Sequence, residues 1–215
     1  MNRKEAYQKA MDESLANSEM WLKEAKLISK KGCKGHSQAL LIFAIEELGK
    51  ALMCWLTVKG VYPFNHREID FRSKKSFLQN HDMKSATAIG LSLILSGLEV
   101  DTPEQTIIDS NSGEPIKITT LLTGLGTQVT LARFSWMYVD ITQKTKGQIE
   151  VQSPLEKEPI SLKDGIEDHS NSIESFKKFL KMDKEHPENL EATFSNLKDM
   201  LKEIDKEYPK NPQWS

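Results

Sequence analysis

Hydrophobic residues recur at helical spacing along most of the chain, whereas the alternating pattern of a half-buried strand is nearly absent. The first amphipathic segment spans residues 3–30, and the two glycines of "KKGCKG" can end it. A second and more apolar segment runs from His36 to Val58, where Gly60 and Pro63 break the pattern. These two segments predict an antiparallel helical hairpin.

The remainder of the chain predicts more helices, separated by polar connections rich in proline and glycine. They are expected over residues 75–98, 117–144, 160–182 and 187–207. Within the connections, "QTIID" could form a short element and "QIEVQ" is the only fair strand candidate. We therefore predict an all-α bundle of about five to six helices, with long loops around 101–116 and 145–158.

The length of 215 residues allows the chain to bury a core without disulfides or structural metals. We expect residues 1–182 to form one helical domain, and 183–215 to add a C-terminal helix and tail that pack on it. Cys33 and Cys54 lack C-x-x-C spacing, and the first 25 residues contain no apolar signal block. Both features favour a reduced, cytoplasmic protein whose cysteines fill the core.

Charge and hydropathy restrict the classes of partner. With 29 basic and 31 acidic residues the net charge is −2, which creates no overall field for nucleic acid. A bidentate phosphate contact would have to come from one of four arginines: Arg3, Arg67, Arg72 and Arg133. Residues 39–58 approach the length of a membrane span, but the charges near their middle are costly in lipid, so we expect no membrane partner.

The charges in question belong to "AIEELGKA", where Glu46, Glu47 and Lys50 interrupt an apolar helix. At helical spacing Glu46 and Lys50 share a face, and Lys50 also lies beside Glu47. One interpretation is a surface ion pair worth about 0.2 to 0.5 kcal/mol. The other is a polar patch that is partly buried against a neighbouring helix, because the flanking residues offer few other polar positions.

A second group of polar residues lies in "HDMK", where His81 and Lys84 are three residues apart on one helical face. A histidine at such a position often only caps or satisfies a helix. If His81 instead meets Glu46, the carboxylate would orient the imidazole and favour its charged form.

A third group lies in "ARFSWMYVDI". Arg133 and Asp140 are seven residues apart and would return to nearly the same face of a helix, about 10 Å apart along its axis. Tyr138 would point elsewhere. Charges in so apolar a segment need partners, and Glu46 or Glu47 on another helix could supply them.

The three motifs, in this order and followed by "SP", resemble the AbiV family of abortive infection proteins over roughly residues 5–180. That family belongs to the HEPN superfamily of helical domains. The resemblance implies a cytoplasmic prokaryotic defence protein that stops phage multiplication, often by shutting down translation or RNA metabolism. It also implies a homodimer with the active groove at the dimer interface.

Mapped onto this chain, the resemblance proposes His81, Arg133, Glu46 and Lys50 as catalytic residues. The binding or network positions would be Glu47, Lys84, Tyr138 and Asp140. However, ribonucleases of the superfamily carry an R-x4-6-H motif, in which arginine stabilises phosphate charge and histidine handles the proton. No arginine here is followed by a histidine at that spacing. The chain could be an endoribonuclease with a differently assembled site, or the same residues could form a polar network that fixes the helix register.

Three functions therefore compete. The first is an effector that cleaves or binds tRNA or rRNA, and the second is a non-catalytic helical protein that binds a phage or host translation protein. The third, a metal enzyme built from Glu46, Glu47, His81 and Asp140, is disfavoured because carboxylate-bridged sites use Glu-x-x-His pairs, which are lacking. We expect neither a metal nor another cofactor.

Overall fold

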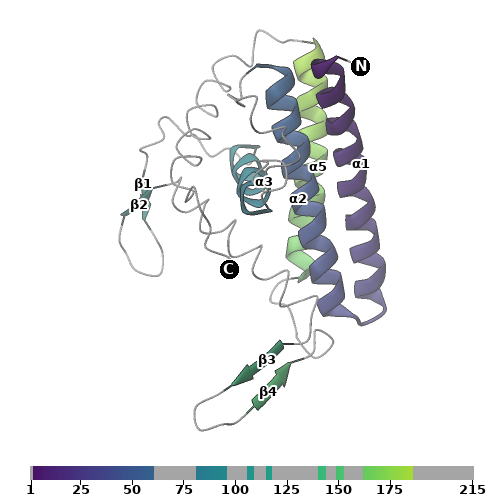
Figure 1. Cartoon of the computed structure of the whole chain (residues 1–215), viewed down its shortest axis with the longest axis vertical. Coiled ribbons are helices and arrows are strands. Elements are labelled where there is room, and N and C mark those ends of the chain that lie inside the picture. The colour runs from purple at the N-terminus through teal and green to yellow at the C-terminus, as the bar shows by residue number, and fades with distance from the viewer. Residues whose placement is uncertain are drawn as a thin grey trace.

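Three long helices lie side by side, and a fourth crosses them, in the computed structural model (Figure 1). The side-by-side helices are α1 (Arg3–Lys30), α2 (Lys34–Val58) and α5 (Leu162–Glu185), and the crossing helix is α3 (His81–Leu95). The structure describes residues 2–60, 81–95, 106–108, 115–117, 140–143, 149–152 and 162–185. The predicted all-α architecture is confirmed.

Local sequence signals account for the α1–α2 hairpin. The side chain of Asn2 accepts a hydrogen bond from the backbone N–H of Glu5 at 2.9 Å, and the Glu5 carboxylate accepts one from the Asn2 N–H at 2.9 Å. This capping box satisfies two donors that a helix start leaves without partners. At the other end Gly32 adopts a φ of 85°, a conformation that side chains with a Cβ rarely adopt, and the chain reverses into α2.

The centre of α2 is the core of the molecule. Every residue from Ala51 to Leu56 is buried, because α1, α3 and α5 all pack against this helix. Trp55 contacts the rings of Phe176 and Phe179 of α5 in edge-on geometry, with centroids 6.5 and 5.0 Å away. Buried Asp183 extends this contact by accepting a hydrogen bond from Trp55 Nε1 at 3.2 Å.

Buried polar contacts also join the three side-by-side helices, α1, α2 and α5. Ser18 of α1 donates to the carbonyl of Ala44 in α2 at 2.7 Å, and its Oγ lies 3.1 Å from Nε2 of His169 in α5. Because the single hydroxyl proton of Ser18 is used on Ala44, its oxygen accepts from Nε2–H of His169. Ser37 similarly donates to the carbonyl of Ala25 at 2.7 Å. These bonds fix how far the helices can slide along one another.

Two short hairpins lie at the connections that the sequence predicted as loops with possible short elements. Strands β1 (Thr106–Ile108) and β2 (Pro115–Lys117) pair antiparallel, with Ile107 opposite Ile116. Strands β3 (Asp140–Gln143) and β4 (Ile149–Gln152) do the same, with Ile141 opposite Val151. Strand β1 lies in the predicted 101–116 loop and β2 at its end, while β4 lies in the 145–158 loop and confirms "QIEVQ" as a strand. The β-branched residues of "DITQ" and "IEVQ" favour extended pairing over helix.

The β3–β4 hairpin corrects the end of one predicted helix. The helix predicted over 117–144 cannot reach its expected end, because Asp140–Gln143 is a strand. Other boundaries agree closely: α2 begins two residues before the predicted start, and α5 continues three residues past 182. The helix expected over 187–207 lies outside the described residues, and the division at residue 182/183 stays a prediction.

Candidate functional site

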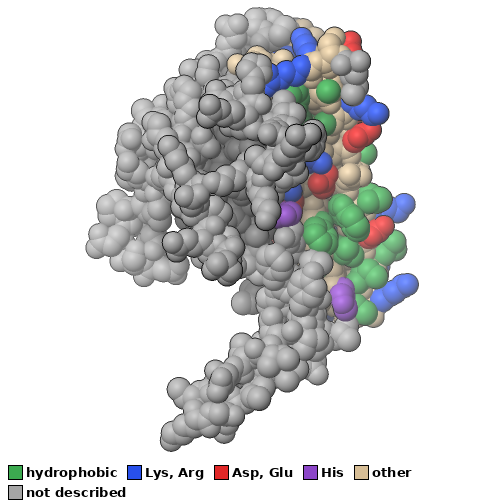
Figure 2. Space-filling model, in the orientation of Figure 1, with side chains coloured by type: hydrophobic (Ala, Val, Ile, Leu, Met, Phe, Trp, Pro, Cys, Tyr) green, Lys and Arg blue, Asp and Glu red, His purple; other side chains and the backbone are tan. Residues whose placement is uncertain are grey.

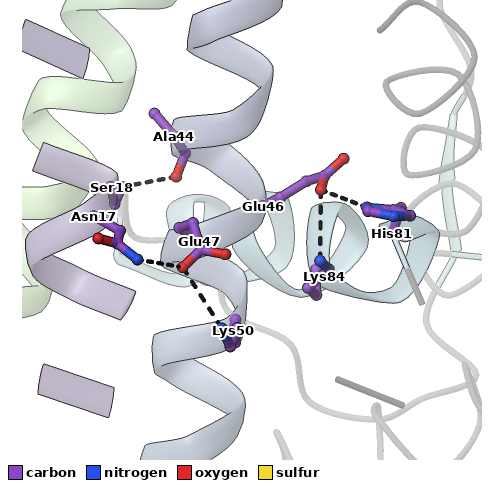
Figure 3. A network of polar contacts seen from close by, with 8 residues as sticks. All are labelled: Asn17, Ser18, Ala44, Glu46, Glu47, Lys50, His81 and Lys84. Carbon is purple, nitrogen blue, oxygen red and sulfur yellow. Dashed lines mark hydrogen bonds and ion pairs between the residues drawn. The ribbon is translucent and has the colours of Figure 1, made fainter. Parts of the chain in front are cut away.

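A buried carboxylate and a histidine meet where α3 crosses α2 (Figure 3). His81, the first residue of α3, places Nδ1 at 2.5 Å from Oε2 of Glu46 in the middle of α2. The Glu46 side chain is 4% exposed, whereas that of His81 is 42% exposed. A carboxylate in this place accepts from Nδ1–H, which orients the ring and selects the tautomer whose Nε2 can take up a proton.

Lys84, one turn after His81 on α3, completes this cluster. Its Nζ lies 3.5 Å from the same Glu46 oxygen, and its side chain is almost entirely buried. Burial lowers the pKa of Lys84, while the Glu46 and Glu47 carboxylates oppose that shift and Lys50 adds to it. Lys84 is thus an internal counter-ion of Glu46 rather than a cation presented to solvent.

Glu47 and Lys50 of the "EELGK" motif face a different neighbour. Glu47 accepts a hydrogen bond from Asn17 of α1 at 3.4 Å and forms an ion pair with Lys50 at 3.7 Å. Figure 3 shows Glu46 directed toward α3, while Glu47 and Asn17 meet between α1 and α2. The sequence placed Lys50 beside both Glu46 and Glu47; in the described part of the chain Lys50 forms its ion pair with Glu47, while Glu46 turns to His81 and Lys84 of α3.

The family model for AbiV, a HEPN domain, matches residues 6–175. The chain belongs to the AbiV family. No curated protein and no solved structure matches it. The match confirms the resemblance seen in the three motifs, the HEPN-like helical fold and, at the level of the family, a HEPN-type function in abortive infection.

The AbiV match contains all eight predicted site residues, and five of them have described side chains. Glu46, His81 and Lys84 form one cluster, and Glu47 and Lys50 form another beside it. Their roles in binding or catalysis stay predictions.

The side chains of the other three predicted residues are not among those that the structure describes. Arg133 and Tyr138 lie outside the described residues. Asp140 begins β3, so the argument that a helix returns Asp140 to the face of Arg133 is wrong. A helical repeat of 3.6 residues does not apply to a residue that lies in a strand.

Two residues of this AbiV chain, Asn17 and Ser18, touch the motif region although the sequence does not point to them. Asn17 holds Glu47, and Ser18 bonds the backbone of α2 at Ala44. Their only signal in the sequence is that they are small polar residues within an amphipathic helix, which is too common to single them out.

The described segments show neither a metal-binding cluster nor a membrane-spanning helix. Within these segments, no group of three or more His, Cys, Asp or Glu side chains is arranged to hold a metal ion. None of the helices described combines the length and apolarity needed to cross a membrane.

Proposed function

We propose that this AbiV-family protein acts in abortive infection by cleaving RNA, with His81 as the proton-transfer residue. The observation that supports this most is the contact of His81 with Glu46 at 2.5 Å, in which a buried carboxylate orients a half-exposed imidazole. Carboxylate–histidine pairs of this kind position a general base and stabilise the imidazolium that forms when it accepts a proton. Such a target would place the protein in the cytoplasm.

In the proposed reaction His81 takes the proton of an RNA 2′-hydroxyl, whose oxygen then attacks the adjacent phosphorus. The bond from phosphorus to the 5′-oxygen breaks, which leaves a 2′,3′-cyclic phosphate. A water molecule protonates the released 5′-oxygen, and the proton on His81 passes back to the hydroxide so formed. The developing negative charge on the phosphate needs a cation. Lys50, whose side chain is 31% exposed, is more accessible to a phosphate than buried Lys84, and Arg133 is a further candidate from the sequence.

The test is cleavage of purified tRNA and rRNA by the wild-type protein and by two groups of variants. We expect His81→Ala and Glu46→Gln to lower the cleavage rate by about 100-fold or more, as general-base catalysts do. His36→Ala is the matched control, because His36 is an exposed histidine in the first turn of α2. It should cleave like the wild type. Intact RNA after long incubation with wild type, or an unchanged rate in His81→Ala, would refute the proposal.

A non-catalytic role is the second candidate, and exposed apolar residues favour it. Met20 and Leu27 of α1 are 43% and 51% exposed, and Figure 2 shows hydrophobic side chains gathered over the α1–α2 face. Apolar surfaces of this kind often bind proteins. A variant with Lys50 and His81 both replaced should still capture a phage or host translation protein in this case. If it folds but captures none, while the wild type does, this candidate fails.

The same apolar surface is consistent with a homodimer, which we propose as the working form. Light scattering should give about twice the mass of one 24.5 kDa chain. Met20→Lys and Leu27→Lys should shift the protein toward monomer if these residues lie in the dimer interface, whereas Lys9→Ala on the same helix should not. A monomer at all concentrations would exclude the dimer.

A further inference from the structure

The glycine of the "EELGK" motif lies where the backbones of two helices touch. A Cβ added at Gly49 would be 1.9 Å from the carbonyl oxygen of Lys84, 2.7 Å from its carbonyl carbon and 3.2 Å from its Cα. All three atoms belong to the backbone of α3. They can give way only if the helix itself moves, so only glycine allows α3 this close to α2.

This backbone contact is one helical turn away from the carboxylate–histidine pair on both helices. Gly49 follows Glu46 by three residues in α2, and Lys84 follows His81 by three residues in α3. Residues three apart lie on the same face of a helix. The contact between Gly49 and Lys84 and the contact between Glu46 and His81 are therefore neighbouring points of one helix crossing.

We propose that Gly49 is a positioning residue: its missing side chain sets the separation of α2 and α3 at which His81 can bond Glu46. The proposal rests on the proposed function for its effect on RNA cleavage, but its structural content is independent of that function. Gly49 itself does not touch substrate. It acts through the backbone of Lys84, and hence through the placement of α3.

The size of the effect follows from the contact distances. To bring the Cβ of an alanine from 1.9 Å to an ordinary contact of 3.4 Å, the Lys84 carbonyl must retreat by about 1.5 Å. The same shift at His81 would lengthen its 2.5 Å contact with Glu46 to about 4 Å, beyond hydrogen-bond distance. A displacement of about 1 Å can lower a catalytic rate by about 100-fold.

The competing explanation is that the ion pair between Lys84 and Glu46 holds the crossing together. That pair spans 3.5 Å and is buried, so it could also fix α3 on α2. The two explanations differ in what they require of position 84. The Gly49 contact uses only its backbone, whereas the ion pair requires its ammonium group.

The experiment compares Gly49→Ala with Gly165→Ala. Gly165 of α5 is also an interhelical glycine, but its added Cβ would meet the flexible end of the Leu41 side chain at 3.1 Å, which can turn aside. The readout is the ¹⁵N NMR shift of His81 Nδ1 at alkaline pH, assigned with His81→Gln. Bonding to Glu46 keeps Nδ1 protonated, whereas an unbonded neutral imidazole favours the Nε2–H tautomer.

We expect Gly49→Ala to shift His81 Nδ1 into the range of unprotonated nitrogen and to lower RNA cleavage by about 100-fold. Gly165→Ala should leave both unchanged. A wild-type Nδ1 signal in folded Gly49→Ala would overturn the proposal. The NMR readout does not depend on cleavage, so inactive wild-type protein would refute the proposed nuclease without affecting this test.

A second variant, Lys84→Met, keeps the proposal testable if Gly49→Ala does not fold. Methionine retains the length and burial of the side chain but removes the ammonium group, and it leaves the backbone contact at Gly49 in place. We expect the Nδ1 signal of His81 to stay that of a protonated nitrogen. Its loss would show that the ion pair positions His81, and would overturn the role of Gly49.

Discussion

Acidification should destabilise the helical bundle through His169. This α5 side chain is 5% exposed, and its Nε2–H donates to Ser18, which in turn donates to the backbone of Ala44. Burial lowers the pKa of His169 from 6.5 to about 4; the Ala44 carbonyl partly opposes this shift, and the positive charge of Lys26 adds to it. At neutral pH the folded protein therefore holds a neutral imidazole.

The sign of the effect follows from proton binding. Between pH 6.5 and about 4 the unfolded chain binds a proton on His169 that the folded chain does not, so the free energy of unfolding decreases as the pH falls. At about 1.4 kcal/mol per pH unit the complete loss is about 3 kcal/mol, reached below about pH 4. Between about pH 7 and pH 5 the loss is about 2 kcal/mol.

The assay is urea denaturation of the wild type and of His169→Gln at about pH 7 and pH 5. Glutamine can still donate an N–H to Ser18 but does not titrate, and the contributions of all carboxylates are common to both proteins. The wild type should lose about 2 kcal/mol more than the variant over this interval. Equal losses in the two proteins would refute the assignment of a buried, neutral His169.

Three further stability predictions can be measured by the same denaturation. Phe176→Ala removes a fully buried ring that packs on Trp55 and should cost about 3 to 5 kcal/mol; a cost below 1 kcal/mol would contradict its place in the core. Ser85→Ala should leave stability unchanged or raise it by up to about 1 kcal/mol, because among the described residues the buried Ser85 Oγ has no hydrogen-bond partner. A clear loss of stability would show that this hydroxyl does have a partner. Asn2→Ala removes the cap of α1 and should cost about 1 kcal/mol, whereas Asn2→Ser should keep it; equal stability of the two variants would refute the role of the cap.

The sequence predicted the α1–α2 hairpin well, for local reasons. Helical periodicity, the glycines around Cys33 and the break after Val58 all act within a few residues, so they can be seen without knowing the fold. The short strands were harder. Four-residue runs such as "DITQ" carry little periodicity, and their pairing depends on a partner strand that propensity alone does not identify.

The candidate site was predicted in its residues but not in its grouping. Glu46, His81 and Lys84 stood out because charged residues interrupt apolar helices or lie at their starts. Which of two adjacent carboxylates meets His81 could not be predicted, because α2 lies between α1 and α3 and the two point about 100° apart. Only the packing of these neighbours assigns Glu46 to α3 and Glu47 to α1.

By itself, the sequence determined the helical class, the hairpin, the family and the polar residues worth examining, since all of these depend on local pattern and residue identity. Tertiary structure alone decided which charges are buried, that Lys84 and His81 share one oxygen of Glu46, and that Gly49 is a contact between backbones rather than a weak point in a helix. The physical reason is that burial and close approach belong to pairs of helices, and a pair is defined only when the chain has folded.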